Sequence, residues 1–328
     1  MSDSADVFVI IPFFQRRPGL LARAVASVAE QGFGARCHVI VVDDGSPVSA
    51  EDDLRSLTEA ERAHVTVIRQ PNGGAGAARN TGLDAVPPHA RVVAFLDSDD
   101  TWSGDHLARA LQAVENGAEL YFAQTAGMDD EVGPPSDAAW PGPAETRAAF
   151  AVPDSVVLNE QFLAYTIRRG LPLQTLVVQA SLCRSVRFAT HLHRAGEDLT
   201  FTLALARVSR LSVFSRRVEA QLGRGVNIYR STLEHGSPEA IPRLLDEVQS
   251  RLDLAAQVRG EPMLVRENDK MCELTLSGLA VQVLAAARRG RVRSLLRVAR
   301  YVATTPSIAA PLTKEAFRAC FGRVRSPS

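Results

Sequence analysis

The sequence predicts an α/β protein in which a doubly wound, mixed but mostly parallel sheet is flanked by helices and followed by a helical C-terminal extension. Over the first hundred residues, short apolar runs alternate with amphipathic segments. This alternation is typical of the strand–helix units that build a parallel sheet. Beyond residue 237 the apolar residues recur at helical spacing instead. Together these two patterns predict the fold class.

Four apolar runs are expected to be strands covered on both faces, because their residues are apolar at consecutive positions. They lie at residues 7–11, 38–42, 65–68 and 92–96. Helices are expected between them, at 18–31, at 51–63 and after a glycine-rich turn at 72–76. Further along, we expect a long loop at 127–143, a strand at 173–179, and helices at 159–169, 197–207, 241–258 and 269–287.

The overall charge balance argues against a nucleic-acid partner. The chain has 328 residues, of which 37 are basic and 37 are acidic, so its formal net charge is zero. A nucleic-acid-binding domain is usually strongly basic. The balance is uneven along the chain, however, because the segment from Arg288 to the end has ten basic residues and one acidic residue. The rest of the chain is therefore acidic.

The cysteines and the N-terminus predict a cytoplasmic protein. The four cysteines, Cys37, Cys183, Cys272 and Cys320, lie far apart and show no metal-ligand spacing. Such cysteines are expected to be reduced thiols. The first residues lack the basic segment of a signal peptide. We also expect no membrane-spanning helix, since no run approaches about 18 consecutive apolar residues.

Polar residues follow three of the predicted strands. Pro12 to Phe14 follow the first strand, Asp43 and Asp44 the second, and residues 97–100 the fourth. In a doubly wound sheet, ligands bind beyond the carboxyl ends of the strands. We therefore expect these residues to meet in one cleft.

Three carboxylates after the fourth strand predict a metal site. Asp97, Asp99 and Asp100 stand almost side by side, and like charges at such short spacing repel one another. A hard divalent cation such as Mn²⁺ or Mg²⁺ explains this run, because it takes oxygen ligands and often bridges carboxylates to a diphosphate. A solvated acidic turn is the simpler alternative.

Five segments in a fixed order resemble family 2 of the inverting glycosyltransferases, which have the nucleotide-sugar fold called GT-A. The segments are VIIPFF, VVDDGS, NGGAGAARNTGL, FLDSDDTW and GEDLTFTLAL. The resemblance extends from Val7 to about Ser237 and implies a catalytic domain at 1–236. Its nucleotide-binding half would be 1–125 and its acceptor-binding half 126–236, with 237–328 as the helical extension.

The resemblance implies which residues bind the nucleotide-sugar. Asp44 would accept a hydrogen bond from the uracil ring, while Asp43 would brace the turn. Arg79 would bring its fixed charge toward the diphosphate. The glycine-rich turn lets the backbone approach an anion closely. The full set of nucleotide-sugar-binding residues implied is Pro12, Phe14, Asp44, Asn72, Gly73, Arg79, Asp97 and Ser98.

The resemblance also implies the metal ligands and the catalytic base. Asp99 would bind the metal directly, and Asp97 would contact the ribose or the metal shell, with His235 as a further candidate ligand. Asp198 would take the proton from the acceptor hydroxyl, with Glu197 as an acceptor-binding residue or a substitute base. Acidic residues at a helix N-terminus can also be simple caps.

The implied reaction is the transfer of a hexosyl or hexosaminyl group from a nucleotide-sugar, expected to be a UDP-sugar. The acceptor would be a saccharide or a lipid-linked glycan of cell-surface polysaccharide synthesis. A basic amphipathic helix near the C-terminus can lie on the inner face of the plasma membrane, or dock on a partner subunit, a second copy or the chain's own acidic part. Its apolar face is modest and contains few large residues, which favours docking. Its apolar face has Val292, Leu295, Leu296, Ala299 and Val302, and its arginines are Arg289, Arg293, Arg297 and Arg300.

Two alternatives use the same residues. The run from Asp97 to Thr101 also fits the D-x-D-x-T pattern of haloacid-dehalogenase-type phosphatases, in which the first Asp is a nucleophile. That family places the pattern after its first strand, whereas here other strand–helix units precede it. The second alternative is a catalytically silent glycosyltransferase-like module that only binds.

Overall fold

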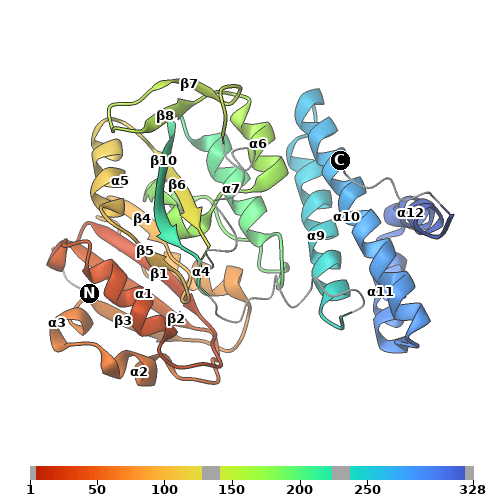
Figure 1. Cartoon of the computed structure of the whole chain (residues 1–328), viewed down its shortest axis with the longest axis horizontal. Coiled ribbons are helices and arrows are strands. Elements are labelled where there is room, and N and C mark those ends of the chain that lie inside the picture. The colour runs from red at the N-terminus through yellow and green to blue at the C-terminus, as the bar shows by residue number, and fades with distance from the viewer. Residues whose placement is uncertain (1–4, 128–140, 224–236, 322–328) are drawn as a thin grey trace. The chain divides into compact units, whose positions relative to one another are not determined.

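The computed structural model describes residues 5–127, 141–223 and 237–321 (Figure 1). The chain divides into two compact units. The first, called the sheet unit, comprises Met1–His191 and Asp198–Val226, and the second, called the helical unit, comprises Leu192–Glu197 and Asn227–Ser328. The predicted boundary after residue 236 adjoins a segment outside the described residues, so it stays a prediction.

The sheet unit contains a mixed sheet with the strand order β3-β2-β1-β4-β9-β6-β10-β8-β7, and β5 pairs with β10. The four predicted strands, β1 to β4, are parallel to one another and lie together on one side of it. β9 is antiparallel to both β4 and β6. The strands are β1 Val7–Phe13, β2 Cys37–Asp43, β3 Val65–Arg69, β4 Val92–Phe95, β5 Thr101–Trp102, β6 Leu120–Ala126, β7 Thr146–Ala149, β8 Ser155–Leu158, β9 Val177–Gln179 and β10 Ser212–Gln221.

Helices cover both faces of this sheet, which confirms the predicted fold class. Successive residues of β1 point to opposite faces, so Val9 and Ile11 join one apolar core and Phe8 and Ile10 join the other. The first core includes side chains of α1 and α5, and the second includes side chains of α4, α6 and α7. The helices of this unit are α1 Leu20–Ala29, α2 Ala50–Asp53, α3 Glu59–Arg62, α4 Ala75–Asp84, α5 His106–Glu115, α6 Phe162–Arg169 and α7 Glu197–Val208.

The predicted continuous helix at 51–63 is wrong. The segment instead forms α2, a 3-10 turn and α3. α3 starts anew because Thr58 and Glu61 form a capping box, in which each side chain binds the other residue's backbone N–H. The predicted strand at 173–179 is also shorter than expected, since Leu173–Thr175 form a 3-10 turn before β9.

The helical unit packs α9 Ala240–Gln257, α10 Pro262–Arg288, α11 Val292–Thr304 and α12 Ala309–Phe321 around one apolar core. Among the described helices, α10 is long and apolar enough to cross a membrane by length and composition, with an 18-residue window of mean hydropathy 1.2. From the sequence, a helix was expected at 269–287 within this segment, and no membrane-spanning helix was expected. Only 28% of that window is buried, although Leu276, Leu279 and Ala280 pack in the core.

Candidate active site

The carboxyl ends of β1, β2 and β4 lie side by side, as the sequence predicts. The register pairs Phe13 of β1 with Asp43 of β2, and the backbone N–H of Leu96 donates to the carbonyl of Ile10. Side chains then join the three strand ends. The Gln15 amide donates to Ser98 Oγ at 3.1 Å, and the Gln15 backbone N–H donates to Ser46 Oγ at 2.8 Å. One continuous site therefore forms at this edge.

Gln15 is buried and joins two of these strand ends, yet the sequence analysis did not single it out. The sequence contains one signal that Gln15 lies in the site. It directly follows the VIIPFF segment, just beyond the end of a predicted strand. Gln70 was missed in the same way, since it is the first residue after β3.

Asp44 organises the glycine-rich turn. Its Oδ1 accepts hydrogen bonds from Gln70 Nε2 and from the Gly73 backbone N–H, both at 2.8 Å. Its Oδ2 accepts one from the Gly74 backbone N–H at 2.8 Å. A carboxylate oxygen can accept about two hydrogen bonds, so Oδ2 retains the capacity for one more. Asn72 adds a bond from its amide to the Asp44 carbonyl at 2.9 Å.

Asp43 braces the turn that follows β2, as hypothesised from the sequence. Its Oδ1 accepts from the Ser46 backbone N–H at 2.8 Å, and its Oδ2 accepts from the Ala50 backbone N–H at 3.1 Å. Phe13 is fully buried in the core. Pro12 and Phe14 are both partly exposed beside it, which leaves their surfaces open to a ligand.

Arg79 connects the helix after the glycine-rich turn to residues 97–100, which we call the acidic turn. It lies on α4, is only 5% exposed, and its Nη2 is 2.7 Å from Asp97 Oδ1. Its guanidinium carbon lies 5.4 Å from the centroid of the Phe188 ring, an additional stabilising contact. From the sequence, Arg79 is expected to face a diphosphate. The structure shows that its positive charge also offsets the negative charge of Asp97.

The acidic turn alternates in burial. Asp97 and Asp99 are partly exposed, whereas Ser98 and Asp100 are buried. Within the described ranges, no three His, Cys, Asp or Glu side chains are grouped so that they could hold a metal ion by themselves. The two partly exposed carboxylates fit a cation that takes its other ligands from a diphosphate and water. His235 lies outside the described residues.

Asp100 supports this turn from inside. Its Oδ1 accepts a hydrogen bond from the Gly223 backbone N–H at 2.7 Å. Burial, together with the charges of Asp97 and Asp99, raises the pKa of Asp100 to about 8. Gly223 also approaches the turn so closely that a Cβ atom there would lie 1.6 Å from the Asp99 carbonyl oxygen. Any other residue at Gly223 would displace the turn.

A buried polar network anchors β10, the strand that leads to Gly223. The Glu219 carboxylate is 1% exposed and accepts hydrogen bonds from four side chains. The donors are His106 Nδ1 at 2.8 Å, Arg109 Nε at 2.8 Å, the Tyr121 hydroxyl at 2.8 Å and the Ser215 hydroxyl at 2.6 Å. Burial acts to raise the pKa of Glu219, but the hydrogen bond and charge of His106 and the bonds from Ser215 and Tyr121 lower it below its usual value.

Replacing Glu219 by Ala is expected to destabilise the sheet unit by about 3–5 kcal/mol, because Arg109 would remain buried without its carboxylate. Chemical denaturation followed by circular dichroism measures this loss. Glu160→Ala is the matched control, since Glu160 is exposed and its loss should change the free energy of unfolding by less than about 0.5 kcal/mol. A similar small change for both variants would contradict an anchoring role for Glu219.

Asp198 lies in the first turn of α7 and is exposed. Its Oδ1 accepts from the backbone N–H of the next residue, Leu199, at 2.7 Å. Glu197 precedes it and is partly buried. In the described part of the chain, no hydrogen bond or ion pair joins Asp198 to the acidic turn. The structure thus leaves its carboxylate accessible to a ligand.

The segment that precedes this acidic pair is held firmly within the helical unit. The backbone N–H groups of His193 and Arg194 donate to Asp246 Oδ2 of α9, at 3.1 and 2.8 Å. Gly196 has a φ of +90°, and a Cβ atom there would lie 2.5 Å from Ser250 Cβ. In the sequence, Gly196 directly precedes the helix predicted at 197–207. The structure shows that its lack of a side chain is required.

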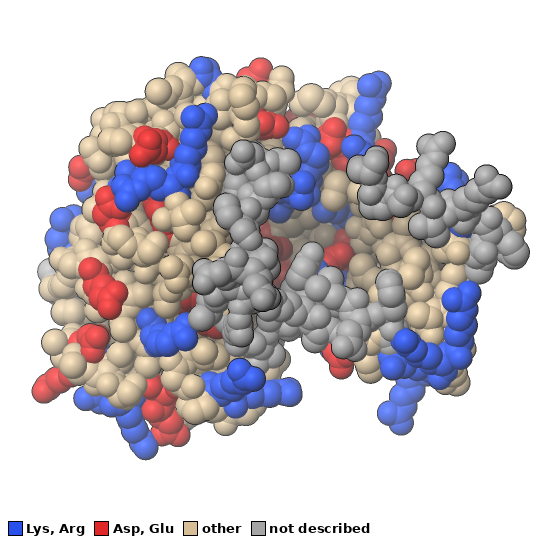
Figure 2. Space-filling view, viewed as in Figure 1, with Lys and Arg blue, Asp and Glu red and all other residues tan. Residues whose placement is uncertain are grey.

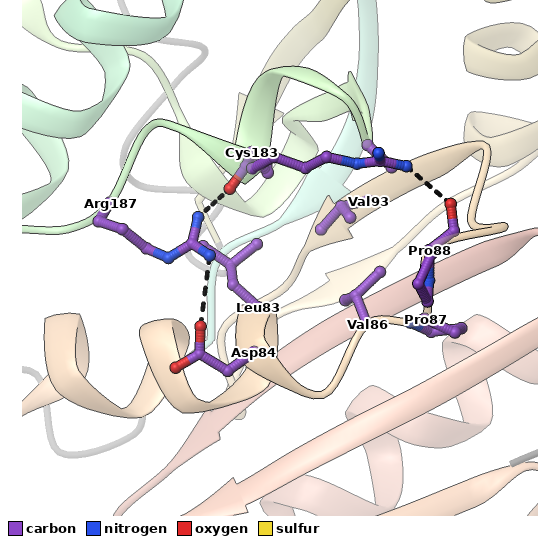
Figure 3. Close-up of a pocket in the computed structure, with 10 residues that line it drawn as sticks. Leu83, Asp84, Val86, Pro87, Pro88, Val93, Cys183 and Arg187 are labelled. Atoms are coloured by element: carbon purple, nitrogen blue, oxygen red, sulfur yellow. Dashed lines mark hydrogen bonds and ion pairs between the residues drawn. The ribbon is translucent and has the colours of Figure 1, made fainter.

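A pocket of about 370 Å³ lies elsewhere in the sheet unit, at the C-terminal end of α4 and the start of β4 (Figure 3). Its two arginines are bound by the protein itself. Arg184 donates to the Pro88 carbonyl, and Arg187 donates to the Cys183 carbonyl and to Asp84 (Figure 3). Both arginines of this pocket are therefore bound within the protein, and Asp84 is its one acidic lining residue among those described.

Comparisons with known proteins identify the family. A model described as glycosyl transferase family 2 matches residues 8–171. Succinoglycan biosynthesis protein ExoW of Rhizobium meliloti (strain 1021) is 36% identical over 264 residues, which cover 79% of this chain and 81% of ExoW. The chain belongs to glycosyltransferase family 2. This glycosyltransferase therefore has the GT-A fold that the sequence predicted, and the phosphatase alternative is wrong.

Solved structures agree with this fold. TarS of S. aureus, residues 1–349 in complex with UDP-GlcNAc, is 15% identical and superimposes with a TM-score of 0.60 over 98% of this chain and 93% of that one. A longer TarS structure is covered over 43% of its length. The mannosyltransferase PcManGT from Pyrobaculum calidifontis, in complex with GDP-Man and Mn²⁺, is 16% identical with a TM-score of 0.55 over 97% of this chain and 88% of that one. At these identities the likeness shows the glycosyltransferase's fold alone.

Proposed function

We propose that this glycosyltransferase transfers a hexosyl or hexosaminyl group from a UDP-sugar to a hydroxyl of a saccharide or lipid-linked glycan, with inversion, in the synthesis of a cell-surface polysaccharide. The observation that carries the proposal is the convergence of Asp44, the glycine-rich turn, Arg79 and the acidic turn at one edge of the sheet. Relatives support it, since ExoW is named for succinoglycan biosynthesis and TarS has been solved with UDP-GlcNAc.

The hydrogen bonding of Asp44 favours uracil as the base. Oδ1 already accepts two hydrogen bonds and Oδ2 accepts one, so one further N–H donor can be bound. Uracil offers a single N–H between two carbonyl groups, whereas guanine offers two adjacent donors. The second donor of guanine would therefore need Oδ1 of Asp44, which already accepts two hydrogen bonds. We infer that the enzyme prefers a UDP-sugar to a GDP-sugar.

Asp99, assisted by Asp97, would hold Mn²⁺ or Mg²⁺. The fit rests on their partial exposure beside a turn whose other side chains, Ser98 and Asp100, are bound within the protein. When bound, such a cation would offset the negative charge on the departing nucleoside diphosphate. Arg79 is close enough to Asp97 to orient that carboxylate and to face the same diphosphate.

Asp198 would act as the general base for inversion. As the acceptor oxygen forms its bond to the anomeric carbon, the bond from that carbon to the diphosphate oxygen breaks and its electron pair leaves with the nucleoside diphosphate. The acceptor hydroxyl proton passes to the Asp198 carboxylate. Its exposure at the start of α7 allows an acceptor to reach it. Glu197 would bind the acceptor or substitute for the base.

The cysteines support a reaction in the reducing cytoplasm. Within the part of the chain that the structure describes, Cys37, Cys183 and Cys272 are all free thiols. Burial raises the pKa of Cys37 and of Cys183 to about 12, so both are unreactive at neutral pH. Such thiols suit a compartment in which disulfides do not form.

UDP and UDP-sugars are expected to stabilise the enzyme against heat more strongly than GDP or GDP-mannose, and more strongly with Mn²⁺ than without it. A ligand at about 100 times its Kd adds roughly 2.7 kcal/mol, which a thermal-shift measurement detects easily. Asp44→Asn should remove most of the UDP effect, because its amide nitrogen would face backbone donors. Asp52→Asn, an exposed carboxylate elsewhere, is the control. A larger shift with GDP would overturn the inference from Asp44.

A further inference from the structure

The helical unit exposes apolar side chains to an unusual degree. Six of the nine large apolar side chains that are exposed in the described residues belong to it. Two of the six lie on α11, where Val292 is 63% exposed and Leu296 is 52% exposed. The opposite side of the helix contributes Val298, which is buried in the core of the unit. α11 thus has one apolar face that the unit uses and a second that it leaves in solvent.

Arginines run along the flank of this second face. The apolar residues Val292, Leu296 and Ala299 are spaced four and three residues apart, so they lie in one row along the helix. Each is followed directly by an arginine, and these arginines, Arg293, Arg297 and Arg300, form a second row. The apolar and basic rows are therefore parallel neighbours on the helix surface. All three arginines are exposed, and none forms an ion pair with another described residue. Figure 2 shows Lys and Arg side chains gathered over the part of the helical unit where α11 lies.

The surrounding sequence contains no opposing charge. Residues 274–314 include six arginines and one lysine but no aspartate or glutamate. A patch that binds a varied protein surface usually mixes both charges, whereas a uniformly basic strip beside apolar residues complements an anionic lipid surface. Two large apolar side chains are also few for a stable dimer, which buries about 800 Å² on each partner.

We propose that the outer face of α11 binds the surface of an anionic lipid bilayer. Val292 and Leu296 would enter the boundary between headgroups and acyl chains, and Arg293, Arg297 and Arg300 would contact lipid phosphates. The helix would lie in the plane of the surface without crossing the bilayer. This contact would keep the enzyme where a lipid-linked acceptor is found, but the inference rests on α11 alone and does not depend on the proposed sugar transfer.

Sedimentation of the purified full-length protein with lipid vesicles tests the proposal. The protein should bind vesicles that contain phosphatidylglycerol and should not bind pure phosphatidylcholine vesicles, and high salt should release it. The triple variant Arg293→Gln, Arg297→Gln, Arg300→Gln should bind roughly a hundredfold more weakly, since each basic residue near an anionic surface contributes roughly fivefold. Leu296→Ser should weaken binding without changing its dependence on salt.

A matched triple variant controls for net charge. Arg62→Gln, Arg210→Gln and Arg216→Gln remove three exposed arginines of the sheet unit and should leave vesicle binding unchanged. Circular dichroism melting curves establish that both triple variants are folded. Equal loss in the two would overturn the proposal, as would equal binding to neutral and anionic vesicles. Absence of vesicle binding together with a dimer that Leu296→Ser dissociates would instead assign the face to a second copy of the chain.

Discussion

Asp99→Ala is expected to reduce sugar transfer roughly a thousandfold or more, which corresponds to about 4 kcal/mol of lost transition-state stabilisation. Asp97 and Asp100 are already engaged, by Arg79 and by the backbone of Gly223, so we expect that neither fully replaces Asp99. The variant should also lose the additional thermal stabilisation that Mn²⁺ gives in the presence of UDP. Initial rates with a UDP-sugar and thermal shifts with and without Mn²⁺ measure the two effects.

Asp105→Ala is the control for this experiment. Asp105 lies a few residues beyond the acidic turn, is exposed and is 3.5 Å from the exposed Arg217. Its loss removes the same charge close to the site but should leave the effect of Mn²⁺ unchanged. If Asp99→Ala retained transfer that depends fully on Mn²⁺, Asp99 would not be a metal ligand. Equal effects of the two variants would indicate a general loss of negative charge instead.

The side of the site formed by β1, β2 and β4 was predictable from sequence because it depends on local patterns. Strands that are apolar at consecutive positions predict a sheet covered on both faces, and the carboxyl ends of parallel neighbours must share an edge. The polar residues that follow those strands, such as Asp44 and Asp97, are therefore brought together by topology. The structure confirms that they meet, while their roles in catalysis stay predictions.

The side formed by β10 was not predictable, because it depends on pairings between residues more than ninety positions apart. β10 runs beside β5 and places Gly223 against the acidic turn. The burial of Glu219 depends on irregular register between β10 and β6, and the three residues before it, Arg216, Arg217 and Val218, are exposed. A glutamate in such a context reads as a surface residue. Periodicity cannot reveal that it accepts four buried hydrogen bonds.

The separation of roles among the adjacent carboxylates also needed the structure. From sequence, Asp97, Asp99 and Asp100 are alike in charge and spacing. Burial distinguishes them, because Asp100 is 5% exposed and bound to Gly223, whereas Asp97 and Asp99 remain partly exposed.

The prediction of one continuous helix at 51–63 was wrong for a different reason. The capping box at Thr58 and Glu61 is a signal for a helix start that the sequence contains, and the prediction did not use it.

Asp198→Asn is expected to lower kcat by roughly a hundredfold to ten-thousandfold, the usual contribution of a general base. Asparagine keeps the shape of the side chain, and its oxygen can still accept the hydrogen bond from the Leu199 backbone N–H. The start of α7 should therefore fold normally. An amide cannot take up the acceptor proton, so transfer fails while stabilisation by UDP and Mn²⁺ is retained. Steady-state rates and thermal shifts on the same preparation separate the two effects.

Glu197→Gln is the decisive comparison, because the two carboxylates are adjacent and carry the same charge at the start of one helix. If Asp198 is the base, Glu197→Gln should raise KM for the acceptor and change kcat much less. The reverse pattern would assign the base to Glu197. We propose that the strand ends bind the donor and that the acceptor binds at the start of α7. If Asp198→Asn weakened UDP binding as strongly as Asp99→Ala does, this division would be wrong. Only retained donor binding with lost transfer is consistent with a proton acceptor at Asp198.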